Sequence, residues 1–442
     1  MKSAVMQRLR TGYPEVGGWG RLEYTDWIDE SFSWKSDCYV GDWSFLDELH
    51  VEGPDALRLF SDFCVNSFEK FALGQAKHVI ACNTAGKVIG EGILMRLGEQ
   101  KFEFQALGPV TDWFEYNCKK GDYAAHATIG RAKFKFQVSG PKALYLLEEL
   151  TQQGLRDIKF MHVKNVDMKL CDARFLRQGM AGEIGFEIQG PLEQGREAMK
   201  VIIAVGNSYN IRRLGTRAAM INHLEACFPT VTHDYLPAVC EPDERDFYDY
   251  VSSSARRIPG RMWSLDGCLK VKGSFEAEDV SAWYRSPVEL AWYRNIKFDH
   301  DFYGRAALEA ELASPKRKIV TLEWNGEDCS DVQNSLYRGD EEPYDFMDMP
   351  RQHNFGMNAH KVLKDGQLVG AATSRSFSVY FRKMLSHCVI DVAHSAPGTP
   401  VTVIWGDPGR RQREIRAIVA ASPYKKDNRK ADIATLPSKL PV

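Results

Sequence analysis

The feature that most constrains the fold is a repeated unit, in which an alternating strand runs through Gly-Pro into an amphipathic helix. The first copy is FLDELHVEG (45–53) followed by PDALRLFSDFCV (54–65), and the second is KFKFQVSG (133–140) followed by PKALYLLEEL (141–150). A strand with one apolar face and a helix with one apolar stripe bury both by packing together. The repeat therefore predicts two related α+β halves, each with its helix started by a proline.

The rest of the chain predicts more strands than helices. HVIACNTAGKVIGEGILMRLGEQKFEFQAL (78–107) reads as a three-stranded meander with turns at Ala85-Gly86 and Gly98-Glu99. After residue 320 the helical pattern fades, and the strands there predict a small antiparallel barrel or sandwich. The opening 35 residues show no sustained period, which indicates an irregular arm, and the basic run RRQREIR (410–416) predicts an exposed hairpin.

Length and composition limit the domain count and the partners. A chain of 442 residues usually forms two or three domains, and the polar, proline-containing segment LASPKRK (312–318) predicts a boundary between domains 1–315 and 316–442. The formal net charge of -2 argues against nucleic acid as a binding partner. The ten cysteines are scattered without metal-ligand spacing, and no apolar stretch reaches the roughly 18 residues of a membrane span. We therefore expect a cytoplasmic protein, monomeric or homodimeric, with no metal site and no membrane association.

Several segments together resemble the aminomethyltransferase superfamily, which contains the T-protein of the glycine cleavage system. These segments are LGQAKHVIACNTAGKVIGEGI (73–93), FQVSGPKAL (136–144), RQGMAGEIGFEIQGP (177–191), KFDHDFYGRAALEA (297–310) and GQLVGAATSRSFSVYFRKMLSHCVIDV (366–392). They span nearly the whole chain in the family's order. The resemblance implies a T-protein-like α+β fold, with two folate-binding subdomains that interleave and a C-terminal antiparallel β-barrel or sandwich domain.

Within that superfamily the chain is most similar to the tetrahydrofolate-dependent O-demethylases of methoxyaromatic compounds, a group that includes vanillate O-demethylase. The shared stretches include VNSFEKFALGQAKHV (65–79), LEWNGED (322–328) and VTVIWGD (401–407). This similarity implies a one-carbon transferase with tetrahydrofolate as its cofactor. Its reaction would remove a methyl or a bridging methylene group from an aromatic ether and leave a phenol or catechol.

The resemblance also implies which residues bind the cofactor. Glu187 occupies the acid of the GFEI motif that binds the pterin, and a carboxylate suits the adjacent N–H donors of a pterin edge. Glu91 stands where aminomethyl-transferring members carry an aspartate near the reactive end of folate, and it is therefore a candidate catalytic residue. His78, Gln105 and Trp292 are further cofactor-binding candidates.

Three departures from the family pattern bear on the substrate. His223 precedes LEAC (224–227) where members that act on glycine-derived groups carry an arginine. Leu107 stands where aromatic-acid demethylases keep an arginine for the substrate carboxylate, so a substrate without a carboxylate becomes an option. Cys240 stands where those demethylases carry a tyrosine. We take these three positions as substrate-binding candidates.

Ether cleavage needs a proton donor, because the leaving group of an aryl methyl ether is a phenoxide, whose conjugate acid has a pKa of about 10. The segment THDYLPAVC (232–240) places His233, Asp234 and Tyr235 in consecutive positions. We expect Tyr235 to be the acid, with His233 or Asp234 relaying the proton. Two alternatives stay open: N- or S-demethylation of a small methylated donor, and a non-catalytic folate-binding protein.

Overall fold

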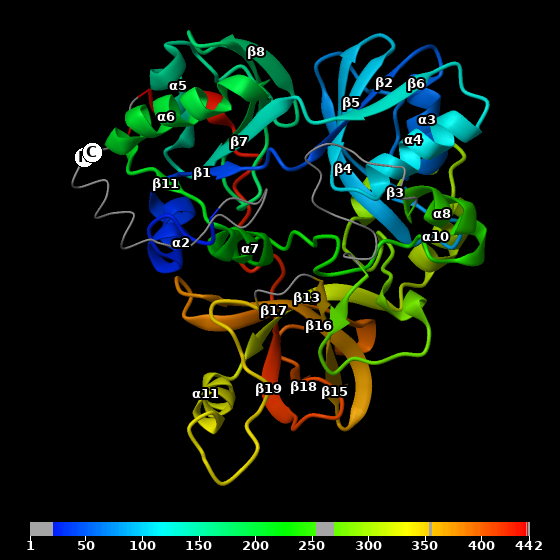
Figure 1. The fold of residues 1–442 in the computed structure, drawn as a ribbon, viewed down its shortest axis with the longest axis vertical. Helices are drawn as coiled ribbons and strands as arrows, with labels where there is room; N and C mark the ends of the chain where they lie inside the picture. Colours follow the sequence, from blue (N-terminus) through cyan, green and yellow to red (C-terminus); the bar gives the residue numbers. More distant parts are fainter. Residues whose placement is uncertain (1–20, 253–268, 353–355, 439, 441–442) are drawn as a thin grey trace.

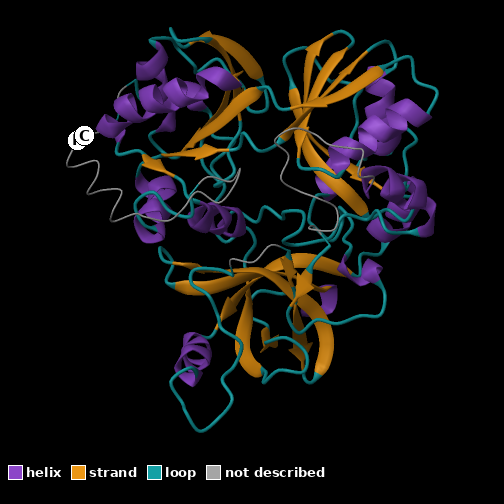
Figure 2. Ribbon diagram, viewed as in Figure 1, coloured by secondary structure: helices purple, strands orange, loops and turns teal. Residues whose placement is uncertain are grey.

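The computed structural model describes residues 21–252, 269–352, 356–438 and 440. Two sheets lie side by side with helices on their outer sides, and a β-barrel lies beneath them (Figures 1 and 2). Helix α7 and the irregular segments that follow it run between the sheets and the barrel (Figure 1). The arrangement is the predicted T-protein-like α+β fold with a C-terminal barrel.

The first sheet has the order β3-β4-β5-β2-β6 and is antiparallel throughout. Its strands are β2 (Asp47–Glu52), β3 (Ala76–Cys82), β4 (Val88–Gly98), β5 (Lys101–Ala106) and β6 (His126–Gly130). Strands β3, β4 and β5 form the predicted meander. Leu49, Val51, Phe102 and Phe104 project from one face and pack against helices α3 (Ala56–Phe63) and α4 (Val110–Lys120).

The second sheet has the order β11-β1-β7-β10-β9-β8. Its strands are β1 (Tyr39–Asp42), β7 (Lys133–Ser139), β8 (Val163–Asp167), β9 (Asp172–Arg177), β10 (Gly185–Pro191) and β11 (Arg212–Arg213). Phe134, Phe136 and Val138 pack on the side of helices α5 (Ala143–Thr151) and α6 (Gly195–Gly206). Strand β1 precedes β2 in the chain but pairs in this second sheet, so the two halves interleave.

The predicted repeat is visible in the backbone at two glycines. Gly53 ends the first strand of the repeat with φ +132°, and Gly140 ends the second with φ +135°. A Cβ at either position would collide with a backbone carbonyl, that of Ala124 or that of Asp37, so only glycine fits. Both helices then begin two residues after the proline, at the first residues of α3 and α5.

Two helices contradict the prediction for their segments, one in the expected irregular arm and one after residue 320. The remaining helices are α2 (Trp27–Ser36), α7 (Thr216–Glu225), α8 (Arg245–Ser252), α10 (Arg305–Ala313) and α11 (Gly326–Ser335). Helix α2 replaces part of the expected arm, and its periodicity is hidden because it buries polar residues such as Glu30 and Ser33. Helix α11 begins after Asn325, whose side chain caps it. None of the helices in the described part of the chain is long and apolar enough to cross a bilayer.

The C-terminal strands close into a six-stranded antiparallel barrel, which settles the choice between a barrel and a sandwich. They are β13 (Arg317–Trp324), β15 (His360–Lys364), β16 (Gln367–Ser378), β17 (Lys383–Asp391), β18 (Pro400–Trp405) and β19 (Arg413–Ala420). A separate short pair joins β12 (Val271–Lys272) to β14 (Met357–Asn358). The prediction of an exposed basic hairpin at 410–416 is confirmed: β18 and β19 pair antiparallel around the turn 406–412, with Trp405 opposite Arg413, and the arginines are exposed or half-buried. The later part of the same strand, 417–420, closes the barrel against β13.

The second face of each sheet is polar and nevertheless buried. Alternation with one polar face usually means that this face meets water. Here the polar faces of the two sheets meet each other, in a contact that we call the polar seam. Its members are Glu48, Glu103 and Gln105 from the first sheet, and Lys133, Lys135, Gln137, Arg174, Glu187 and Gln189 from the second.

Charge pairing offsets the free-energy cost of burying these polar groups. Lys135 Nζ lies 2.7 Å from Glu48 Oε1, and both side chains are fully buried. Lys133 Nζ lies 3.1 Å from Glu48 and 3.2 Å from Glu103. Although burial raises the pKa of Glu48, a hydrogen bond with His50 and the charges of Lys135 and Lys133 hold it well below its usual value. The seam therefore joins the two halves through ionised groups, of which Glu48, Lys135 and Glu103 are buried while the Lys133 side chain stays partly exposed.

We predict that Lys135→Met lowers the free energy of unfolding by about 3 kcal/mol, because it leaves the Glu48 carboxylate buried with one cation fewer. Since the folded state lowers the pKa of Glu48, the pair's contribution is complete above about pH 5 and declines as the pH falls. Urea unfolding at pH 7 and pH 4 measures both effects. Lys164→Met is the control, because Lys164 pairs with Asp157 at the surface and should change stability by less than about 1 kcal/mol. Equal losses in the two variants would contradict this account of the seam.

Candidate active site

A cavity of about 140 Å³ opens at the edge of the polar seam, beside α7. Strands β4, β5 and β10, the β1–β2 connection, α7 and the segment after it all contribute to its wall. Its lining includes Trp43, Phe45, Glu91, Gln105, Leu107, Gln178, Glu187, His223, Phe228, Thr230, Val231 and Arg351. Five of the residues predicted for the site, namely Glu91, Gln105, Leu107, Glu187 and His223, therefore share one cavity.

Glu187 is a buried acid in the wall of this cavity. Its Oε1 accepts a hydrogen bond from Gln189 at 2.6 Å, and its Oε2 accepts one from Gln178 at 3.1 Å. Burial raises the pKa of Glu187, while the two amide donors and the charge of Lys135 act in the opposite direction. A carboxylate has about four acceptor positions, so one on each oxygen stays available. Glu187 can thus accept two adjacent N–H groups of a flat heterocycle.

Gln105 connects this acid to the first sheet. Its Oε1 accepts a hydrogen bond from Gln189 Nε2 at 3.0 Å, and its Nε2 donates to Glu103 Oε1 at 2.8 Å. Arg174 Nη1 donates in turn to Glu103 at 3.0 Å and to Gln189 at 3.2 Å. The orientation of Glu187 is therefore fixed by bonds that cross the seam. Gln105 lines the cavity, but its polar atoms are used within this network.

Glu91 is oriented by a histidine behind the wall. His78 Nε2 lies 2.8 Å from Glu91 Oε2, and His78 Nδ1 lies 3.1 Å from the side-chain amide nitrogen of Asn295. An amide N–H donates to Nδ1, so the ring hydrogen lies on Nε2 and points to the carboxylate. The indole of Trp292 packs edge-on against His78, with 5.2 Å between ring centroids. His78 and Trp292 are thus absent from the cavity lining and support Glu91 from behind.

His223 presents a neutral imidazole to the cavity. Its Nδ1 lies 2.8 Å from the carbonyl oxygen of Ala219, one turn earlier in α7, and so carries the hydrogen. Burial lowers the pKa of His223 to about 4. Its ring packs edge-on against Trp43 at 6.0 Å and Phe228 at 5.6 Å. This corner of the cavity is therefore aromatic and uncharged.

The three consecutive residues 233–235 do not form a relay. Tyr235 is fully buried, is not part of the cavity lining, and its hydroxyl has no hydrogen-bond partner within the described chain. Burial raises the pKa of Tyr235 well above 10, so its phenol is a weak acid. His233 points toward a separate small cavity that it shares with Arg351, and its pKa is lowered to about 4 by burial. Consecutive side chains diverge here because the segment is irregular.

Asp234 braces the segment against the barrel. Its Oδ1 accepts a hydrogen bond from Thr373 at 2.7 Å and contacts His387 Nδ1 at 3.0 Å, while Oδ2 accepts from the backbone N–H of Thr230 at 2.9 Å. Burial opposes ionisation of both partners, yet their mutual attraction lowers the pKa of Asp234 to about 2 and raises that of His387 to about 10. The pair is a buried ion pair that positions residues 230–235.

Leu107 and Cys240, two of the predicted substrate contacts, lie in different places. Leu107 lines the cavity and packs in the apolar cluster that contains Val231 and Tyr235. Cys240 is not in the lining; it packs between two other clusters, and its backbone N–H donates to Tyr284 Oη at 3.2 Å. The cavity wall therefore keeps Leu107 as a candidate contact and does not include Cys240.

Several residues that the fold brings to the cavity could not be predicted from the sequence. Trp43 and Phe45 follow β1, and Phe228 follows α7, all in irregular segments without periodicity. Arg351 comes from a loop between α11 and β14, far along the chain from the other lining residues. An abundance of aromatic residues was the only signal that could have pointed to the first three.

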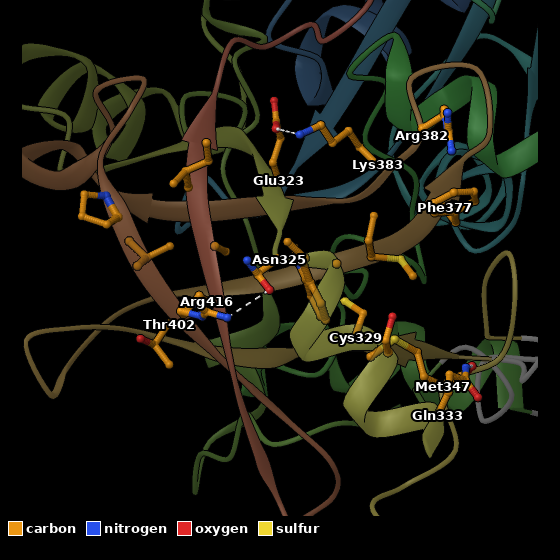
Figure 3. Close-up of a pocket in the computed structure, with 18 of the residues that line it drawn as sticks. Glu323, Asn325, Cys329, Gln333, Met347, Phe377, Arg382, Lys383, Thr402 and Arg416 are labelled. Carbon is orange, nitrogen blue, oxygen red and sulfur yellow. Dashed lines mark hydrogen bonds and ion pairs between the residues drawn. The ribbon is translucent and has the colours of Figure 1, made fainter. Parts of the chain in front are cut away.

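A larger cleft of about 1240 Å³ lies on the barrel, between its strands and α11 (Figure 3). Several of its charged side chains are bonded to one another or to a neighbouring residue. Glu323 pairs with Lys383 at 3.1 Å, and Arg416 bonds to Asn325 at 3.2 Å (Figure 3) and to Asp328 at 2.9 Å. None of the predicted site residues lines this cleft. Size alone would favour it, but the cavity at the seam holds the buried acids and aromatic rings that a reaction can use.

Comparison with known proteins agrees with the T-protein-like fold described above. The family model described as the GCVT N-terminal domain matches residues 5–246. The chain belongs to the GCVT family. A crystal structure of glycine cleavage system aminomethyltransferase T from Bartonella henselae has a TM-score of 0.68 at 18% identity, and covers 96% of this chain and 98% of that one.

Two curated relatives match almost end to end. Sesamin methylene transferase of Sinomonas sp. (strain No.22) is 32% identical, with 95% of this chain and 94% of the relative covered. Syringate O-demethylase of Sphingobium sp. (strain NBRC 103272 / SYK-6) is 30% identical, with 95% and 92% covered. Aminomethyltransferases also match, such as that of Thermoanaerobacter pseudethanolicus (strain ATCC 33223 / 39E) at 22% identity, with 94% of each chain covered.

We predict that the Asp234–His387 pair gives the protein a stability component that disappears at high pH. A raised pKa in the folded state means that His387 contributes fully below about pH 6.5, and that the contribution declines as the pH rises toward 10. The lowered pKa of Asp234 means a second decline as the pH falls below about 4. Urea unfolding of the wild type and of His387→Gln between pH 6 and pH 10 tests the first decline. The difference in stability between them should shrink with rising pH, and parallel profiles would refute the assignment.

Proposed function

We propose that this chain is a tetrahydrofolate-dependent one-carbon transferase, which removes a methyl or bridging methylene group from an aromatic ether and leaves a phenol or catechol. One observation carries the proposal: a single cavity is lined by the acid expected for the pterin, Glu187, by the acid expected near the reacting carbon, Glu91, and by aromatic side chains. The two end-to-end relatives are named for activities on sesamin and on syringate, which supports an ether substrate.

The residues of the cavity fit a reduced folate. Glu187 has one unused acceptor position on each oxygen, which matches adjacent ring N–H and amino donors. Trp43, Phe45 and Phe228 offer flat apolar surface to a ring. When bound, tetrahydrofolate supplies the nitrogen nucleophile that takes up the one-carbon group. The protein adds the positioning of the folate nitrogen and the ether carbon within a site that excludes water.

Glu91 is the group best placed to handle the proton. Methyl transfer breaks a C–O bond and forms a C–N bond, and one proton must move from the nitrogen side to the phenolate oxygen. Glu91 lines the cavity and is held by the N–H of His78, whereas Tyr235 lies behind the wall and keeps its proton tightly. We therefore propose that Glu91 accepts this proton and passes it to the leaving oxygen, with His78 as its positioning residue.

The function is tested by incubating the protein and tetrahydrofolate with methoxy- and methylenedioxy-substituted aromatics, and detecting folate products by mass spectrometry. We expect methyl- or methylene-tetrahydrofolate together with the phenol or catechol. A methylated glycine and a sulfonium compound serve as alternative donors. Product from those donors alone would move the assignment to N- or S-demethylation, and folate binding without any product would favour a binding protein.

We predict that Glu187→Gln weakens tetrahydrofolate binding about 10- to 100-fold, because hydrogen bonds to a charged acceptor are worth about 1.5–3 kcal/mol. Isothermal titration measures the change. Glu193→Gln is the control, since Glu193 is exposed on the surface after β10. Equal affinity in the two variants would place the pterin elsewhere.

The proton assignment makes a separate prediction. Glu91→Gln should lower kcat by about 10²- to 10⁴-fold, the usual contribution of a proton-transfer group, while tetrahydrofolate affinity stays within a few-fold. Tyr235→Phe should lower kcat by less than about tenfold, because its hydroxyl does not reach the cavity. The reverse order of the two effects would restore Tyr235 as the acid.

A further inference from the structure

Arg351 reaches the cavity from a loop that is hydrogen-bonded to the barrel. The backbone N–H of Phe377 in β16 donates to the carbonyl of Pro350 at 2.8 Å, and Arg351 itself bridges to Ser376. Arg375 Nη2 donates to the carbonyl of Asp348 at 2.7 Å. The backbone at and before Arg351 is therefore bonded to β16, and its side chain lies in the wall between the candidate site and the small cavity beside His233.

The guanidinium of Arg351 has no partner of its own within the described residues. It donates no hydrogen bond there, and no carboxylate lies within 4.0 Å of it. Among the residues that line the candidate site it is the one lysine or arginine, and the other charged groups are the acids Asp42, Glu91 and Glu187. The neighbouring Arg375, by contrast, bonds to backbone carbonyls and to Gln352.

An unpartnered guanidinium in such a place is costly. Burial lowers the pKa of Arg351 to about 10, and the charges of Asp348 and Asp234 offset this only in part. Asp234 is already committed to His387, and Asp348 lies 3.5 Å from Arg217. An anion that enters the cavity would relieve this cost, and a guanidinium offers a carboxylate two parallel N–H donors.

We propose that Arg351 binds the carboxylate of an aromatic acid substrate, and so sets the specificity of the reaction; this inference rests on the proposed function. The strand position at which the family's aromatic-acid demethylases keep an arginine holds Leu107, and the barrel loop supplies the missing cation from another direction. The glutamyl carboxylates of folate are the second source of the same chemistry. The experiment has to separate the two sources.

The test compares 4-hydroxy-3-methoxybenzoate with its carboxamide in the wild type, Arg351→Gln and Arg351→Lys. We expect Arg351→Gln to weaken binding of the acid about 10- to 100-fold by calorimetry, with a similar loss in kcat/KM, and Arg351→Lys to restore part of it. The carboxamide should change by less than about twofold. Arg410→Gln is the control, because Arg410 is exposed and pairs with Asp345 on the barrel surface.

Equal binding of acid and carboxamide by the wild type, with no effect of Arg351→Gln, would overturn the proposal. So would a variant that binds tetrahydrofolate more weakly but tetrahydropterin normally, because the guanidinium would then belong to the glutamyl tail. Calorimetry measures binding without turnover. The proposed transferase activity and the proposed carboxylate site at Arg351 can therefore be rejected independently of each other. Arg351-dependent binding without folate product from any ether would reject the transferase activity and leave the carboxylate site, whereas turnover with Arg351-independent binding would reject the carboxylate site alone.

Discussion

The ion pair between Glu48 and Lys135 is the contact on which the arrangement of the molecule depends. Each residue lies on the polar face of its sheet, and neither side chain reaches water. A buried charge left alone costs several kcal/mol, so the two sheets must dock in the register that brings the pair together. Lys133, Glu103 and Arg174 extend the same constraint along the seam.

The candidate site takes its electrostatics from this seam. Glu187 belongs to the network through Gln189 and Gln105, so the bonds that join the two halves also aim the acid at the cavity. Charged groups act more strongly in such surroundings, because little water screens them. The two sheets form two sides of the site, and the barrel contributes the third. The pair of Asp234 and His387 holds the segment after α7, and a barrel loop delivers a cation to the wall.

The family resemblance predicted how the subdomains and the barrel are assembled, and the residue patterns predicted many of the strands but not the burial of their polar faces. Alternation in β2 and β7, with Gly53 and Gly140 at their ends, indicated the two related halves correctly. Nothing in the alternation showed that the polar faces would also be buried, because that depends on a partner sheet far along the chain. Helices α2 and α11 were missed because they bury or expose polar residues without an apolar stripe.

The same distinction applies to the site. Residues on regular strands and helices, such as Glu91, Glu187 and His223, were predicted by family resemblance and do share a cavity. The prediction of a proton relay at 233–235 treated neighbours in sequence as neighbours in space, which an irregular segment does not guarantee. Arg351 could not be predicted, because only the docking of the barrel brings its loop to the cavity.

The central claim is that the cavity at the seam, and not the larger barrel cleft, is where chemistry occurs. A crystal structure of the protein with a bound reduced folate tests it most directly. The account predicts a pterin edge hydrogen-bonded to Glu187 and a reactive end beside Glu91. A pterin seated among Glu323, Asn325 and Arg416 in the barrel cleft, with the seam cavity filled only by water, would contradict it.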